Sequence, residues 1–166
     1  MKNLKEYMFI GFIFVSILGT LFHFLYDLSG NNFLVGLFTA QNESVWEHTK
    51  LLFFPMVLFS LYKKRDLTTK YPKIKDGILF GAVCGTFLIP VLFYTYSGAL
   101  GYNLTAVDIS IFYVCVAFAF FIAYKFTASN KHTPNQNLLN ITVLILTILY
   151  IVFSIYPPKI ALFVSP

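Results

Sequence analysis

The residues best suited to chemistry lie in two short stretches of the sequence. The first closes an apolar run with His23 and Asp27, and the second reads Asn42-Glu43-Ser44-Val45-Trp46-Glu47-His48-Thr49-Lys50. Imidazole and carboxylate groups bind metal ions such as zinc, and they also act as general acids and bases. Asp108, near the start of a later apolar run, adds a further carboxylate. We therefore predict that these residues contribute to a polar site.

Helical geometry sorts the side chains of these stretches. Glu43, Glu47 and Lys50 are separated by steps of four and three residues, so on a helix they would share one stripe. His48 would point about 100° away from Glu47. On the preceding apolar run, His23 and Asp27 are four residues apart and share a face. We predict one polar pocket that holds seven ionisable residues: His23, Asp27, Glu43, Glu47, His48, Lys50 and Asp108.

The apolar run after the second stretch is short, which indicates that its ionisable residues lie at membrane depth. Leu51–Tyr62 would cover only about 18 Å at about 1.5 Å per residue, whereas the hydrocarbon core is about 30 Å thick. The helix must therefore begin earlier, with Glu47, His48 and Lys50 at or below the interface. Ionised side chains in a bilayer face the bundle interior or a wet cavity, because each costs about 2.5–3.5 kcal/mol at the centre.

Several roles for the pocket stay open. The predicted ligand-binding residues are Asp27, Asn42, Glu43, Glu47, His48, Lys50 and Asp108. The candidate metal ligands, with zinc as the possible cofactor, are His23, Asp27, Glu43, Glu47 and His48. The candidate catalytic residues are His23, Glu47 and His48, with the two histidines as acid and base. The sequence contains no HExxH motif.

Each of these residues also has a purely structural explanation. Ser44-x-x-Glu47 is a capping box, which stabilises the start of a helix. Thr105-x-x-Asp108 is an acidic variant of the same motif. Glu47 and Lys50 would form an ordinary ion pair on a helix, and His23 and Asp27 would form a local hydrogen bond.

The composition is that of an integral membrane protein. The 166 residues are 58% hydrophobic and only 11% charged, whereas soluble domains carry about 25% charged residues. A soluble core of this length cannot bury 20 phenylalanines. These figures exclude a disordered chain, an ordinary cytosolic enzyme and a nucleic-acid-binding module, so no nucleic-acid partner is expected.

Five apolar stretches approach the length of about 20 residues that a membrane-spanning helix needs. They are approximately Tyr7–Tyr26, Val45–Tyr62, Gly77–Tyr96, Val107–Phe126 and Leu138–Tyr156. We predict an all-α fold, with one integral membrane domain over residues 1–166 that forms a polytopic bundle of about five transmembrane spans. The expected surroundings are the lipid bilayer of the plasma membrane.

The basic residues predict the orientation of the spans. If the spans alternate, ten of the 12 lysines and arginines fall on one side: Lys2, Lys5, Lys63, Lys64, Arg65, Lys70, Lys73, Lys75, Lys125 and Lys131. Cytoplasmic loops carry the excess of basic residues. The N-terminus is therefore predicted in the cytoplasm and the C-terminus outside, and the polar pocket is predicted to face outward.

Gly77, Gly81 and Gly85 form a stripe of small residues at steps of four. Such stripes let helix backbones approach closely in membranes. The stripe predicts close packing within the bundle, with contact between two copies of the chain in a homo-oligomer as the alternative.

The segment Asn42–Leu51 resembles the NES-x-WEH-x-KL signature of an uncharacterised family of small polytopic membrane proteins of Gram-positive bacteria. His23-Phe24-x-Tyr26-Asp27 is also similar to that family, as is Tyr156-Pro157-Pro158 followed by Leu162-Phe163. The resemblance implies a membrane location and no activity. An acidic residue near the C-terminal tail of that family has no counterpart in Val164-Ser165-Pro166.

Three classes of function are compatible with the sequence. The first is binding or transport of a small polar or lipid-linked ligand, with Glu47 and His48 at the centre of the pocket and Lys50 balancing charge or binding an anionic headgroup. The second is an intramembrane enzyme, a metal- or histidine-dependent hydrolase or acyltransferase that acts on lipids at the outer leaflet. The third is a non-catalytic accessory or sensing subunit.

Overall fold

The computed structural model describes residues 3–62, 65–129 and 135–165, and across these ranges the chain forms helices and no strand. The predicted all-α fold is confirmed. The helices are α1 (Leu4–Leu28), α2 (Phe33–Gly36), α3 (Val45–Leu61), α4 (Arg65–Lys70), α5 (Ile74–Leu100), α6 (Thr105–Ala128), α7 (Gln136–Ile155) and the short 3-10 helix η1 (Ala161–Phe163).

Four helices, α1, α5, α6 and α7, are long and apolar enough to cross a membrane. They contain four of the five predicted spans almost completely, and they fit an integral membrane protein. The remaining predicted span corresponds to α3, whose 17 residues cover about 26 Å at about 1.5 Å per residue. Since α3 is shorter than the hydrocarbon core, a total of five spans stays a prediction.

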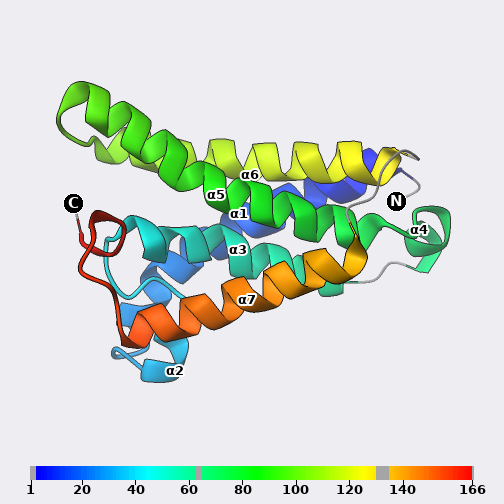
Figure 1. The fold of residues 1–166 in the computed structure, drawn as a ribbon. Helices are drawn as coiled ribbons and strands as arrows, with labels where there is room; N and C mark the ends of the chain where they lie inside the picture. Colours follow the sequence, from blue (N-terminus) through cyan, green and yellow to red (C-terminus); the bar gives the residue numbers. More distant parts are fainter. Residues whose placement is uncertain (1–2, 63–64, 130–134, 166) are drawn as a thin grey trace.

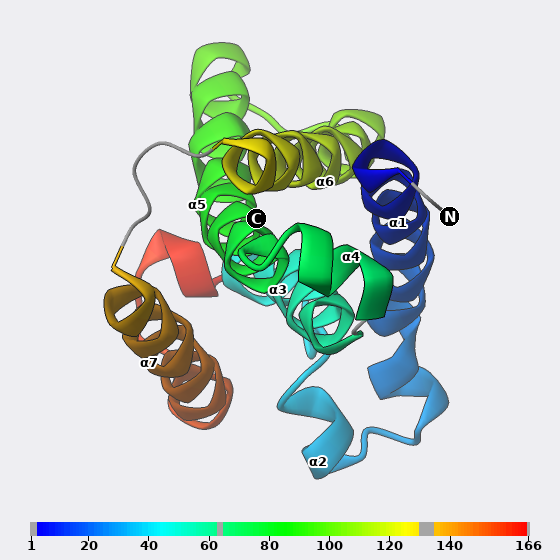
Figure 2. The same cartoon turned by 90° about the vertical axis from the view of Figure 1, so that its right-hand side faces the viewer.

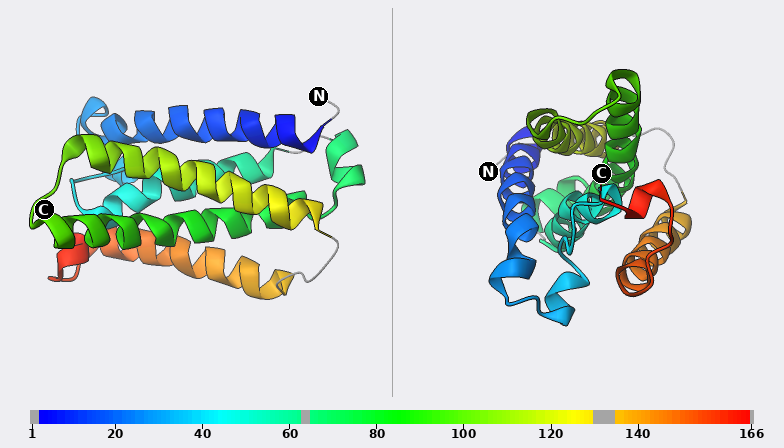
Figure 3. Two further views of the ribbon diagram at one scale, coloured as in Figure 1. Left: turned by 90° about the horizontal axis from the view of Figure 1, so that it is seen from above. Right: turned by 90° about the vertical axis from the view of Figure 1, so that its left-hand side faces the viewer.

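The long helices run side by side and alternate in direction, so the two ends of the chain lie at opposite ends of the bundle (Figures 1 and 3). Seen along the bundle, α1, α3, α5 and α6 form one group, while α7 lies on the far side of α3 and α5 from α1 (Figure 2). Helix α3 is the most enclosed, because 12 of its 17 residues are buried. Protein rather than lipid therefore surrounds most of α3.

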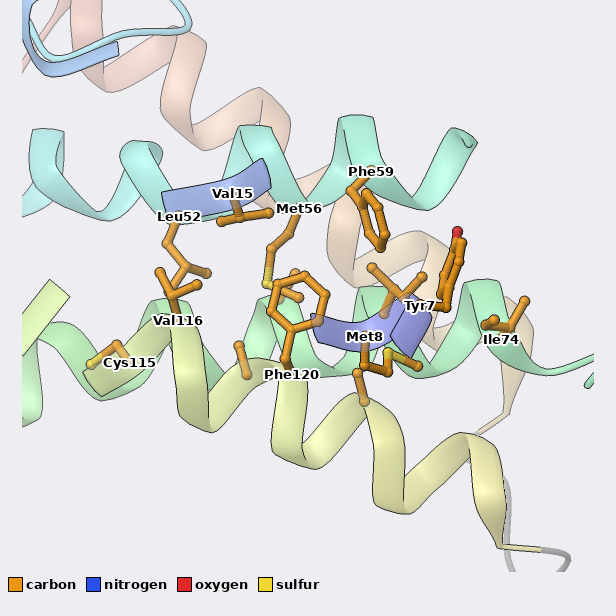
Figure 4. Packing of buried hydrophobic residues seen from close by; sticks show 14 of the residues in the cluster. Tyr7, Met8, Val15, Leu52, Met56, Phe59, Ile74, Cys115, Val116 and Phe120 are labelled. Carbon is orange, nitrogen blue, oxygen red and sulfur yellow. The ribbon is translucent and has the colours of Figure 1, made fainter. Parts of the chain in front are cut away.

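The core between these helices consists of apolar side chains of α1, α3, α5 and α6. Val15 of α1, Leu52 and Met56 of α3, and Val116 of α6 are fully buried and meet in the middle of the bundle, with Phe120 beside them (Figure 4). In a membrane, such close packing holds helices together by dispersion contacts rather than by exclusion of water. This packing closes the bundle between its two ends.

The glycine stripe of α5 is used within the chain. A Cβ atom on Gly81 would collide with the backbone of Ala119 on α6, and one on Gly85 would lie 2.8 Å from the Ala119 side chain. A Cβ atom on Gly77 would collide with Thr127 and Ala123, which also belong to α6. The stripe therefore allows α5 and α6 to touch. A homo-oligomer through these glycines stays a prediction, and it would require α6 to move away.

The described basic residues are concentrated at the end of the bundle that holds the N-terminus. Lys5 begins α1, Lys125 lies in the last turn of α6, and the α4 region with the start of α5 carries Arg65, Lys70, Lys73 and Lys75 (Figure 1). Lys2, Lys63, Lys64 and Lys131, which also entered the orientation prediction, lie outside the described residues. The orientation of the chain in a membrane stays a prediction.

Candidate functional site

The start of α3 is defined by a side-chain cap. Ser44 has an extended backbone, and its hydroxyl accepts a hydrogen bond from the Glu47 amide over 3.4 Å. The Ser44 amide donates to Asn42 Oδ1 over 2.9 Å, which stabilises the turn before the helix. Caps of this kind satisfy amides that the first turn leaves without partners. The helix therefore begins at Val45, and Glu43 lies outside it.

This boundary corrects the predicted stripe of Glu43, Glu47 and Lys50. The spacing placed all three on one helical face, but Glu43 precedes the cap and follows the path of the loop instead. Its carboxylate reaches His48, 3.4 Å from Oε2 to Nε2, and His23, 3.6 Å from Oε2 to Nε2. The two histidine Nε2 atoms are 3.3 Å apart.

His23, Glu43 and His48 thus form a compact group, here called the histidine cluster, from the C-terminal part of α1, the loop before α3 and the first turns of α3. One candidate ligand atom from each of the three residues lies within 4.8 Å of the others, so the group could hold a metal ion. The cluster is accessible, because 31% of each histidine side chain and 68% of the Glu43 side chain is exposed.

Hydrogen bonding assigns the tautomer of His48. Its Nδ1 lies 2.9 Å from the carbonyl oxygen of Ser44. A carbonyl oxygen only accepts, so Nδ1 carries the hydrogen and donates it. The Nε2 of the neutral ring then presents a lone pair to His23 and Glu43. A backbone partner on one ring nitrogen is the usual arrangement for a histidine that binds metal through the other.

The Nδ1 atom of His23 is buried and has no hydrogen-bond partner within the part of the chain that the structure describes. No described partner at Nδ1 therefore fixes the tautomer of His23. The acceptor atoms His48 Nε2 and Glu43 Oε2 face each other, and His23 Nε2 is a third acceptor when the His23 hydrogen is on Nδ1. Such a convergence favours a metal ion between them.

The histidine cluster lies at the edge of a cavity of about 620 Å³ between α1, α3, α5 and α6. Most of the wall is aliphatic or aromatic, and the remaining polar contributions come from Thr20, Asn103, Thr105, Asp108 and Tyr113. Its lining residues include the C-terminal part of α1 and the first turns of α3. Figure 1 shows these parts of the two helices at the end of the bundle opposite the N-terminus. The cavity is large enough for a small ligand.

Asp108 of α6 lines this cavity and is held by α5. The hydroxyl of Tyr96 donates to Asp108 Oδ1, and the Leu104 amide donates to the Tyr96 oxygen over 3.0 Å. Helix α6 begins at Thr105 with Leu104 as its N-cap and no side-chain cap bond. Asp108 is therefore not the capping residue that the Thr105-x-x-Asp108 pattern suggested.

Glu47 and Lys50 form a second polar group, here called the buried ion pair, away from the cavity. Lys50 Nζ donates to Glu47 Oε2 over 2.7 Å, and the two side chains are 0% and 3% exposed respectively. Lys50 also donates to the carbonyls of Gly36 and Thr39 and, over 2.5 Å, to Ser154 Oγ of α7. Glu47 Oε2 accepts from the Gln41 amide over 2.9 Å.

The prediction of one pocket for seven ionisable residues is therefore wrong in its geometry. Consecutive residues on a helix point about 100° apart, and α3 is enclosed, so His48 and Glu47 meet different neighbours. His48 faces the cavity, whereas Glu47 and Lys50 face the loop before α3 and α7. The simple helix ion pair was the better interpretation of Glu47 and Lys50, although the pair is buried rather than solvated.

Two other predicted residues lie apart from both groups. Asp27 is exposed and does not line the cavity, and in the described ranges no hydrogen bond joins its carboxylate to His23. Asn42 stabilises the turn before α3 through its bond from Ser44. The binding and catalytic roles of all predicted residues stay predictions.

The sequence interpretation missed the hydroxyl groups of Thr20 and Tyr113, which lie 3.1 Å apart between α1 and α6 at the cavity wall. Thr20 precedes His23 by three residues, so its place on the same helical face was available from spacing. Tyr113 had no comparable signal, because only the packing of α6 beside α1 brings it to this position.

The comparisons with known proteins place the chain in a family without assigning it an activity. No curated protein and no solved structure matches it. A family model matches residues 1–165, nearly the whole sequence. This protein therefore belongs to the family of unknown function DUF6512.

Proposed function

We propose that this integral membrane protein binds a divalent metal ion, zinc, through His23, Glu43 and His48, and that the ion and the adjoining cavity bind a small polar or lipid-linked ligand. The observation that carries the proposal is the convergence of His23 Nε2, His48 Nε2 and Glu43 Oε2, with separations of 3.3, 3.4 and 3.6 Å.

Two of these separations match the edges of a zinc coordination tetrahedron, and the third, 3.6 Å between His23 and Glu43, is slightly longer. Bonds of about 2.0–2.1 Å in tetrahedral geometry place the ligand atoms about 3.3–3.4 Å apart. Two histidines and one glutamate are also a known ligand set for zinc, and three protein ligands leave a position for water or another ligand. The cavity beside the cluster offers room for that ligand.

The position of the cavity supports binding over transport. The apolar residues Val15, Leu52 and Val116 are fully buried in the middle of the bundle, between the cavity and the basic end. A second candidate function, a hydrolase, draws support from the same open coordination position, because zinc lowers the pKa of bound water to about 7 and makes it a nucleophile.

We further propose that the cavity faces the outside of the plasma membrane. The basic residues at the opposite end support a cytoplasmic location for the N-terminus. The alternation of the long helices supports five passes, with α3 as the short, enclosed one. An impermeant thiol reagent on intact cells should label Tyr102→Cys, between α5 and α6, and not Asp66→Cys on α4. The reverse pattern would contradict the orientation.

Metal analysis tests the main proposal. The protein, purified in detergent, is loaded with zinc, passed over a desalting column and measured for metal by elemental analysis. Wild type should retain near-stoichiometric zinc, while His23→Ala and His48→Ala should lose it. Asp27→Asn is the matched control, since this exposed carboxylate lies four residues from His23 but does not belong to the cluster.

A protein that holds no zinc above the chelator background would refute the proposal. Equal zinc content in wild type and His48→Ala would refute it as well. In the first case, a hydrogen bond between the two imidazoles would account for their contact.

A further inference from the structure

The cavity beside the histidine cluster adjoins the outer surface of the bundle between α1 and α6. A second hollow of about 330 Å³ on that surface is lined by Ser16, Ile17, Thr20, Leu21 and Tyr113. Thr20 and Tyr113 line both hollows, and their hydroxyls are 3.1 Å apart. This pair of side chains therefore lies between the cavity and the second hollow.

In a bilayer crossed by α1, the boundary formed by Thr20 and Tyr113 would lie at the depth of the acyl chains. Thr20 is eight residues before Leu28, where α1 ends, which corresponds to about 12 Å along the helix. Around it, Ile17 and Leu21 of α1 are 58% and 54% exposed. Exposed aliphatic side chains on a membrane-spanning helix face lipid, so the outer hollow opens to the bilayer rather than to water.

The charges in the cavity restrict the ligand. Among the residues that the structure describes, the cavity is lined by the imidazoles of His23 and His48 and the carboxylates of Glu43 and Asp108, and by no lysine or arginine. Lys50, the predicted partner of an anionic headgroup, is fully buried in the other polar group. The Asp108 carboxylate accepts a hydrogen bond from the Tyr96 hydroxyl. A divalent cation would balance Glu43 and Asp108, so the loaded cavity would be neutral.

We infer that the ligand of the cavity is an uncharged lipid with a hydroxyl, ester or amide group, and that it enters sideways from the bilayer between α1 and α6, past Thr20 and Tyr113. Its oxygen would bind the proposed metal ion, and its chain would lie against apolar side chains such as Leu51, Ile89 and Phe112. The charge preference rests on the proposed function, while the entrance rests on the two hollows alone.

Photolabelling tests both parts. Wild type in phosphatidylcholine nanodiscs is exposed to three photoactivatable probes with the same hexadecyl chain that end in a hydroxyl, an amine or a phosphate. The hydroxyl probe should label cavity residues, in competition with unlabelled hexadecanol. The phosphate probe should label at least about tenfold less, because the cavity offers its charge no free cationic side chain. Preferential labelling by the amine or the phosphate probe overturns the charge assignment.

Substitutions at the boundary test the entrance. Thr20→Trp fills it and should reduce labelling by the hydroxyl probe several-fold. Ile13→Trp is the matched control, because Ile13 is 41% exposed on α1, two turns away, and lines neither hollow. Tyr113→Ala widens the boundary and should speed labelling, so the test holds even if Thr20→Trp does not fold.

The outcomes separate this inference from the proposed function. Zinc content is measured on the same samples, and Thr20→Trp should keep it. If wild type contains no zinc but Thr20→Trp is labelled less than Ile13→Trp, the result contradicts the metal site and supports the entrance. Equal labelling of Thr20→Trp and Ile13→Trp, or unchanged labelling of Tyr113→Ala, overturns the entrance whatever the zinc content.

Discussion

Removing one member of the buried ion pair should destabilise the protein strongly. Lys50 is 0% exposed, and its Nζ donates to Glu47, to two backbone carbonyls and to Ser154. Lys50→Met keeps the length of the side chain but leaves Glu47 as a buried carboxylate whose one remaining hydrogen bond within the described residues comes from the Gln41 amide. Breaking a buried pair in this way costs about 3–5 kcal/mol.

Removing both charges should restore most of the lost stability. In Glu47→Gln with Lys50→Met, neither charge of the buried pair remains, so the free energy of unfolding should return to within about 2 kcal/mol of wild type. The coupling free energy between the two positions should therefore be at least about 2 kcal/mol. This double-mutant cycle measures the interaction between Glu47 and Lys50 directly, because the effects of each single substitution on the unfolded state cancel.

Reversible unfolding in mixed micelles of dodecyl maltoside and dodecyl sulfate provides the assay. Lys125→Met is the control, since Lys125 is exposed in the last turn of α6 and its substitution should cost less than about 1 kcal/mol. The reasoning fails if Lys50→Met falls within about 1 kcal/mol of wild type, or if the effects of the two substitutions simply add.

Two further predictions concern helix packing and the cap of α3. Gly81→Ala should cost about 1–3 kcal/mol in the same unfolding assay, because its Cβ would strike the α6 backbone. Gly98→Ala on α5 should be neutral or stabilising, since a Cβ at this position would meet no described atom of another element within 4 Å. Equal effects of the two substitutions would contradict the packing argument. Ser44→Ala should cost about 1 kcal/mol and weaken zinc retention by releasing Glu43. Asn3→Ala removes the cap of α1 and should leave zinc retention intact; loss of zinc in both variants would contradict the local effect.

The distribution of apolar residues predicts most of the fold. All five predicted spans correspond to helices, with ends that differ by a few residues. The reason is that a membrane-spanning helix satisfies its own backbone hydrogen bonds, so its existence depends on local composition alone. Helix α3 departs from this pattern, because burial among neighbouring helices replaces part of the apolar length that contact with lipid would require.

The residues of the candidate site were found in the sequence, but their grouping was not. His23, Glu43, His48 and Asp108 all line the cavity, and each is recognisable as an ionisable residue in or beside an apolar run. The mistaken stripe arose because spacing rules hold only inside a helix, and the Ser44 cap starts the helix after Glu43.

The sequence alone indicated an all-α chain with helices apolar enough to cross a membrane, candidate site residues in a few short stretches, and different directions for His48 and Glu47 on one helix. The tertiary structure alone decided which neighbours those directions meet. The bond from Lys50 joins residues 104 positions apart, and the bond between Thr20 and Tyr113 joins residues 93 positions apart. Local spacing cannot predict such contacts, because they depend on how whole helices pack against one another.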